Sequence, residues 1–142
     1  IDGADLVLAE VPAAHLAWMT PPAGATGAGA AFDGPGNQES VLAQAGAAAP
    51  AVSHCAGLVA GGHDDWHLPA IEELRAVFAE IDVLTAAGAD LAAPQHHWSS
   101  TESSDSRALA IKLKGGGRHG RIDAKAYHKH SSRRVVCVRL AY

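Results

Sequence analysis

Two histidines and four carboxylates gather in one stretch, GGHDDWHLPAIEELRAVF, at residues 61–78. His63 and His67 are four residues apart, the spacing of two zinc ligands on one helix. Gly62 and Pro69 bracket them, however, and the zinc-protease pattern of two histidines flanking a glutamate is missing. We therefore expect no catalytic metal here, and we interpret the nine histidines of the chain as surface or packing residues.

Asp64 and Asp65, from the same stretch, have the side chains of a general acid and base or of calcium ligands. In a glycine-rich turn just before a helix, an acidic pair more often caps that helix. We interpret residues 61–78 as a structural corner of the fold, and we expect the protein to use neither a metal nor a cofactor.

Hydroxyl side chains are concentrated in WSSTESSDS, residues 98–106, where a serine nucleophile would be sought. No Gly-X-Ser-X-Gly elbow surrounds these serines, and no histidine stands at a defined spacing from one of them. We expect them to form a turn or loop and to make hydrogen bonds. The GATGAG stretch at 24–29 likewise lacks the spacing of a dinucleotide-binding loop.

Charge is distributed unevenly along the chain, whose net charge is −4. Residues 107–142 carry ten Lys and Arg against Asp123 alone, whereas residues 1–106 carry fourteen acids against Arg75 alone. This asymmetry indicates either a surface for an anionic partner or two parts of one fold that attract each other. No nucleic-acid-binding motif accompanies the basic segment, so we do not expect a nucleic acid partner.

The elements that position these residues are those of one globular domain spanning residues 1–142. Hydrophobic residues make up 48% of the chain and charged residues 18%, which excludes a disordered protein. No apolar run approaches the roughly 20 residues of a membrane-spanning helix. The chain starts at Ile1 with neither a methionine nor a charged-then-apolar leader, and we expect it to be the C-terminal part of a longer chain.

Two segments have helical patterns. Residues 38–62 are rich in alanine and are interrupted by Pro50, which predicts one broken helix or two short ones. Ile71, Leu74 and Phe78 recur at helical spacing, which predicts a helix directly after the corner.

Short apolar runs predict strands within 5–11 and 15–19, followed by a long loop. Residues 107–114, RALAIKLK, alternate aliphatic residues with lysines, as expected for a half-buried strand. Residues 118–130 suit a polar strand pair or a loop, and 133–142 suit one closing strand.

The two cysteines of the chain are Cys55, in the second half of the alanine-rich segment, and Cys137, in the closing strand. A nearby helix and strand would let them bond in an oxidising compartment. Two buried free thiols remain the alternative from the residues alone.

Three motifs, HCAGLVAGGHDDWHLPAIEELRAVF, HHWSSTESS and RRVVCVR, occur in this order over residues 54–139. Together they resemble the C-terminal domain family of the Legionella collagen-like adhesin. That family's pattern runs from a helix cysteine through Gly-x-x-Asp-Trp-Arg-Leu-Pro and Trp-Ser-Ser-Thr to Arg-Cys-Val-Arg. This chain departs from it at His67, where the family has arginine, and at Ala70 and Val136.

The resemblance implies an α+β, C-type-lectin-like fold, related to the formylglycine-generating enzymes, with a small twisted antiparallel sheet, two helices and long loops. It also implies a disulfide between Cys55 and Cys137. The corner would hold a helix against the sheet, with Trp66 and Leu68 packed inward and Asp65 bonded to neighbouring backbone. The structural residues expected on this basis are Asp65, Trp66, Leu68, Pro69 and Trp98.

The resemblance further implies a non-catalytic domain that binds a glycan or protein receptor at the tip of a surface adhesin or phage tail fibre. Such a domain would be extracellular, at a cell surface or on a virion tail, and would act as a homotrimer. Two alternatives stay open: an enzyme of the formylglycine-generating or metal-dependent type, and a structural or assembly domain of a fibre.

We expect the ligand surface on the basic C-terminal third, because an outward face rich in lysine and arginine suits an anionic receptor. Its predicted residues are Lys112, Lys114, Arg118, His119, Arg121, Lys125, Tyr127, His128 and Lys129.

Overall fold

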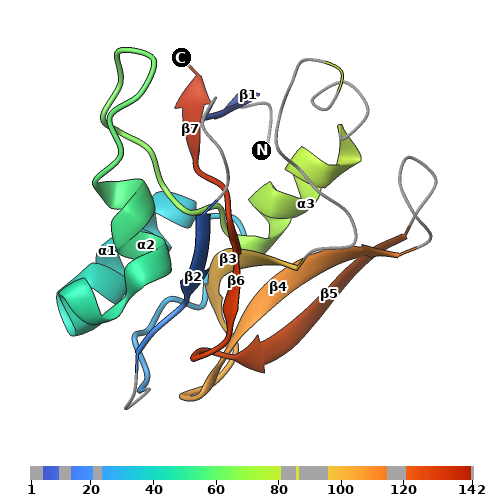
Figure 1. The fold of residues 1–142 in the computed structure, drawn as a ribbon. Coiled ribbons are helices and arrows are strands. Elements are labelled where there is room, and N and C mark those ends of the chain that lie inside the picture. Colours follow the sequence, from blue (N-terminus) through green and yellow to red (C-terminus); the bar gives the residue numbers. More distant parts are fainter. Residues whose placement is uncertain are drawn as a thin grey trace.

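The computed structural model describes residues 5–9, 14–20, 24–80, 86, 96–114 and 121–141. Its helices are α1 (Gly34–Ala45), α2 (Pro50–Ala56) and α3 (Ile71–Ala79), with a short 3-10 turn, Gly46–Ala48, between the first two. A five-stranded sheet has the order β2 (Ala14–Ala17), β6 (Ser132–Val135), β3 (His97–Glu102), β4 (Arg107–Lys114), β5 (Arg121–His128). A second, two-stranded sheet pairs β1 (Asp5–Leu8) with β7 (Val138–Ala141). Helices α1 and α2 lie next to the β2 end of the large sheet, and α3 lies against β3 and β4 (Figure 1).

The described fold is α+β, as expected, but it differs from the expectation in two respects. It has three α-helices where two were expected, because the alanine-rich segment forms two helices. The large sheet is mixed rather than antiparallel, because β3 and β6 pair in parallel.

Local sequence accounts for the ends of the helices. Asp33 caps α1 by accepting a hydrogen bond from the Gly36 N–H at 2.9 Å, and a proline occupies the first turn. Gly46, with φ of 53°, ends this helix, and Pro50 begins α2. The predicted break therefore separates two helices, as the sequence allowed.

Helix α3 and the hairpin of β4 and β5 follow their sequence patterns closely. Ile71, Leu74 and Phe78 are buried and pack with Ile111 of β4. Within the segment predicted as a strand pair or a loop, Arg121–His128 form the single strand β5, which pairs with β4 along its whole length.

Strand β3 corrects the prediction of a turn or loop for residues 98–102, whereas residues 103–106 do form the turn between β3 and β4. It lies inside the sheet, and its residues from His97 to Thr101 are buried. The hydroxyl groups are satisfied there: Ser99 donates to the Leu109 carbonyl at 2.7 Å and Thr101 donates to the Ala30 carbonyl at 2.9 Å. Such partners let polar residues occupy a central strand, and tertiary context overrides their preference for turns.

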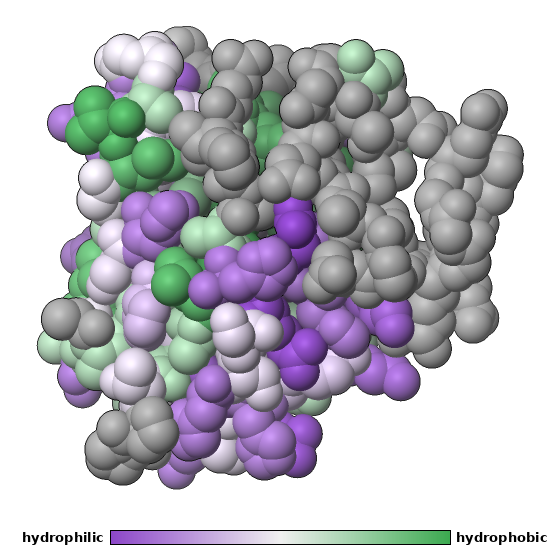
Figure 2. Space-filling model, viewed as in Figure 1, coloured by the Kyte–Doolittle hydropathy of each residue, from purple (hydrophilic) through white to green (hydrophobic). Residues whose placement is uncertain are grey.

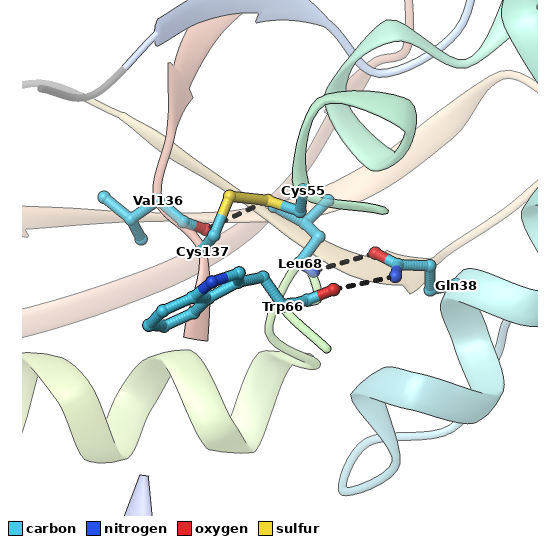
Figure 3. The surroundings of a disulfide bond; sticks show 6 residues. All are labelled: Gln38, Cys55, Trp66, Leu68, Val136 and Cys137. Atoms are coloured by element: carbon cyan, nitrogen blue, oxygen red, sulfur yellow. Dashed lines mark hydrogen bonds between the residues drawn. A yellow bond between two sulfur atoms is a disulfide. The ribbon is translucent and has the colours of Figure 1, made fainter. Parts of the chain in front are cut away.

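The predicted closing strand is divided into two. Strand β6 pairs with β2 and β3, whereas β7 leaves this sheet and pairs with β1. Between them lie Val136 and Cys137, and Cys137 forms the predicted disulfide with Cys55 of α2, the Cα atoms being 5.4 Å apart. The disulfide thus ties α2 to the point where the chain changes sheets (Figure 3).

Candidate functional site

The corner is a packed part of the fold, as predicted. Trp66 and Leu68 are buried, at 4% and 0% exposure. The Trp66 indole N–H donates to the backbone carbonyls of Ala60 and His63. Gln38 of α1 joins the same segment through two backbone hydrogen bonds, donating to the Trp66 carbonyl and accepting from the Leu68 N–H (Figure 3).

A buried pair lies at the position where this chain departs from the family pattern. His67 Nε2 is 3.2 Å from Glu73 Oε1, and both side chains are 3% exposed. The same carboxylate oxygen accepts from the Ala70 N–H at 2.9 Å and so caps the start of α3. Gly34 approaches the pair so closely that a Cβ atom there would overlap both side chains. The histidine therefore takes a structural place in the corner.

Asp65 lies at the surface of the corner and binds a side chain of the last strand. Arg139 Nε donates to its carboxylate at 2.6 Å, and a second bond from the same guanidinium measures 3.1 Å. The hydrogen bonds from Arg139 lower the pKa of Asp65. The structure thus gives Asp65 an ion pair across the fold, and the expected hydrogen bond to neighbouring backbone stays a prediction.

No group of three or more metal-ligating side chains converges within the part of the chain that the structure describes. The hydroxyls of Ser99 and Thr101 in β3 donate hydrogen bonds to backbone carbonyls, and the two cysteines form a disulfide with each other. The contacts described for the corner are packing contacts, hydrogen bonds and ion pairs.

The hairpin of β4 and β5 separates apolar from basic residues. Cross-strand partners share a face, and successive residues alternate between faces. Ala108 pairs with Tyr127, Ala110 with Lys125 and Lys112 with Asp123, so these positions lie on one face. Leu109 and Ile111 lie on the opposite face, toward α3.

We call the face that carries Lys112, Lys125 and Tyr127 the basic face. Lys125 is exposed, and Lys112 and Tyr127 are half-buried. Figure 2 shows hydrophilic residues gathered over the region where Figure 1 places β4, β5 and β6, whereas hydrophobic residues are more frequent over α1 and α2. The structure thus brings together three of the nine predicted ligand residues.

Four of the other predicted ligand residues have side chains outside the described part of the chain. Arg118 and His119 lie wholly outside the described residues. Lys114 and Arg121 pair at the far end of the hairpin, and the register puts their positions on the same face as Lys112.

His128 pairs with Arg107 in the hairpin register, on the face opposite Lys125. Its Nε2 is 3.2 Å from the Arg107 guanidinium. The structure therefore separates His128 from the basic face.

Lys129 does not lie on an open surface, and its predicted placement is wrong. It is fully buried, its Nζ donates to the Gly24 carbonyl at 2.9 Å, and it lies 3.4 Å from Glu102 and 4.8 Å from the centre of the Trp18 ring. Burial opposes ionisation of Glu102, but hydrogen bonds from Thr26 and the charge of Lys129 outweigh it and lower the pKa of Glu102. This lysine joins the 24–30 segment to the sheet.

The basic face continues into a cluster that the sequence did not reveal, made of His96, Trp98, Tyr127 and Arg133, which we call the aromatic cluster. The guanidinium carbon of Arg133 is 4.2 Å from the centre of the Tyr127 ring and 5.5 Å from that of Trp98. His96 Nε2 is 3.0 Å from the Tyr127 hydroxyl. Burial lowers the pKa of Arg133.

No local signal identifies this cluster, because its members come from three separate segments. Arg133 is one of several arginines near the C-terminus, and only the pairing of the strands brings its side chain over the two rings.

None of the described helices is long and apolar enough to cross a membrane.

A comparison with curated proteins finds no match for this chain. A family model, that of the Lcl C-terminal domain, matches residues 12–139, which is nearly the whole chain. The matched region includes the corner, both cysteines and the basic face. The chain therefore belongs to the Lcl C-terminal domain family, whose members are associated with adhesins.

Proposed function

We propose that this protein is a non-catalytic receptor-binding domain of a surface adhesin, and that it binds acidic glycans through the basic face. The observation that carries the proposal is the register of β4 and β5, which puts Lys112, Lys125 and Tyr127 on one face while the opposite face packs against α3. Lysines on a sheet face attract anionic polymers.

The disulfide supports an extracellular site of action. Disulfides persist in oxidising compartments, and Cys55 and Cys137 form one that is buried in the core. The same bond favours binding over catalysis of the formylglycine-generating type, because that chemistry requires reactive cysteines. Elemental analysis of the purified protein for zinc and copper tests the enzyme alternative directly.

We further propose a C-type-lectin-like arrangement and a homotrimer at the tip of an adhesin fibre or phage tail. Several copies of a weak site, held together on one fibre, bind a polyvalent surface more tightly than one copy does. Light scattering on the purified protein tests the trimer, and a monomer at every concentration would count against self-assembly by this domain.

Binding to dextran sulfate, with uncharged dextran as the control polymer, tests the glycan proposal. We expect binding to dextran sulfate only, and we expect it to weaken as salt rises, because the Debye length falls to about 8 Å at physiological ionic strength. The double variant Lys112→Glu and Lys125→Glu should reduce this binding strongly. Arg75→Glu, on α3 and away from the basic face, is the matched charge reversal and should have little effect.

A further inference from the structure

We propose that Arg133, with Tyr127 and His96, forms a subsite for the carboxylate of an acidic sugar at the end of the basic face. This inference rests on the proposed function and names the chemistry of its ligand: a glycan that contains sugar acids, such as a uronic acid polymer.

The guanidinium of Arg133 lies over two aromatic rings. The Tyr127 ring lies 4.2 Å and the Trp98 ring 5.5 Å from its central carbon, at distances typical of cation–π contacts. Such contacts orient a guanidinium plane but use none of its N–H donors. Two aromatic rings therefore position this group, while within the described residues its Nε–H is left without a hydrogen bond.

Within the described residues, Arg133 has no carboxylate partner. Its Nε is buried and makes no hydrogen bond there. Two other cations of this protein each form an ion pair with a carboxylate: Lys129 pairs with Glu102, and Arg139 pairs with Asp65. Lys129 also lies over an aromatic ring, that of Trp18, so Arg133 differs from both in having no acid partner among the described residues.

A partly desolvated cation without an anion is costly, and an anion that binds it recovers much of that cost. The burial of Arg133 therefore favours an anionic ligand at this point over a cationic or neutral one. Arginine suits a carboxylate in particular, because its planar fork of N–H donors matches the two oxygens of that group.

The neighbouring residues fit a sugar that carries the carboxylate. The Tyr127 hydroxyl is held by His96 at 3.0 Å, so its orientation is set before a ligand arrives. Lys125 lies two residues along β5 from Tyr127, on the same face, at a spacing of about 7 Å along the strand. A polymer with repeated carboxylates would place one at Arg133 and another within reach of Lys125.

Oligogalacturonate and its methyl ester provide the direct test, because the ester keeps the sugar ring and removes the charge. We expect calorimetry to show binding of the acid and little binding of the ester. Arg133→Met, which keeps an apolar stem against the rings, should lower the affinity for the acid about tenfold or more, since hydrogen bonds to charged groups contribute at least that factor. Arg107→Met, on the opposite face of the hairpin, is the matched control and should change the affinity less than about twofold.

Folding of each variant is checked by its thermal unfolding. If Arg133→Met does not fold, Arg133→Lys decides the question, because it keeps the charge and loses the planar fork. We expect it to bind oligogalacturonate more weakly than the unmodified protein while it binds dextran sulfate normally. An Arg133→Lys protein that binds both ligands normally overturns the subsite.

Two further results would overturn the subsite: equal binding of the acid and the ester, and unchanged binding by folded Arg133→Met. Dextran sulfate separates the subsite from the proposed function. If the Lys112→Glu and Lys125→Glu protein loses dextran sulfate binding while folded Arg133→Met binds both ligands normally, the proposed function stands and the subsite is wrong. If the unmodified protein binds neither polymer, both proposals are wrong.

Discussion

The corner and the aromatic cluster both hold polar groups against large aromatic side chains, but they satisfy those groups differently. In the corner, His67 pairs with Glu73 inside the protein, and Gln38 bonds the backbone beside Trp66. In the aromatic cluster, Arg133 contacts ring faces and has no acid partner within the described residues. The difference indicates that the corner stabilises the fold, and it is the basis of our proposal that the cluster presents a cation to a ligand.

This comparison predicts that changes at the corner and its disulfide alter stability, and that changes on the basic face alter binding. Four variants test this comparison, three at the corner and its disulfide and one, Thr26→Val, at another buried contact. Each is expected to change the free energy of unfolding without changing dextran sulfate binding by the folded protein.

The largest effect is expected from the double variant Cys55→Ser and Cys137→Ser. A bond that closes a loop of 82 residues stabilises by about 4 kcal/mol through the entropy of the unfolded chain. Urea unfolding of the two proteins measures the difference. Intact mass after alkylation, with and without reductant, first establishes that the bond is present; two freely alkylated thiols in native protein would contradict both the bond and the extracellular proposal.

Leu68→Ala tests the packing of the corner. The side chain is fully buried, and its truncation should destabilise the domain by about 3 kcal/mol through lost burial and the resulting cavity. Val59→Ala is the control, because Val59 is 74% exposed and should tolerate the change. Similar unfolding midpoints for the two variants would show that the corner is not part of the core.

His67→Ala and His63→Ala compare two histidines four residues apart. The sequence predicts mild effects for both, but the structure buries His67 against Glu73 and exposes His63. Removing His67 leaves a buried carboxylate with one partner fewer and should cost about 2 kcal/mol, whereas His63→Ala should be neutral. A loss of binding by folded His67→Ala, without a loss of stability, would instead make the corner a functional site.

Thr26→Val is expected to have the smallest effect, and one that depends on pH. Thr26 donates to Glu102 at 2.6 Å and helps to lower the pKa of that carboxyl below its ordinary value of 4.5. A carboxyl whose pKa is lowered in the folded state stabilises the protein at pH values above its ordinary pKa. This contribution is lost as pH falls through the folded-state pKa. Thr26→Val should therefore lower the free energy of unfolding by about 1 kcal/mol at neutral pH. The difference in stability between the variant and the unmodified protein should shrink in acid. Urea unfolding across this pH range measures it, and a constant difference would contradict the assignment.

The strongest local patterns identified several elements correctly. The spacing of Ile71, Leu74 and Phe78 predicted α3, and the alternation in 107–114 predicted β4, because each pattern reports one buried face. The break at Pro50 was placed correctly for the same kind of reason, since proline cannot continue a helix. The family motifs added the disulfide, which the residues alone left open.

The sequence by itself determined those elements, the position of the corner and the basic character of the last third of the chain. Only the tertiary structure decided that Ser99 and Thr101 lie in a central strand, that Lys129 is buried beside Glu102, and that Arg133 reaches Tyr127. The physical reason is that periodicity reports which face of a segment prefers to be buried. The partners that satisfy a hydroxyl or a charge, in contrast, come from segments far away in the sequence and are brought close only by the pairing of strands.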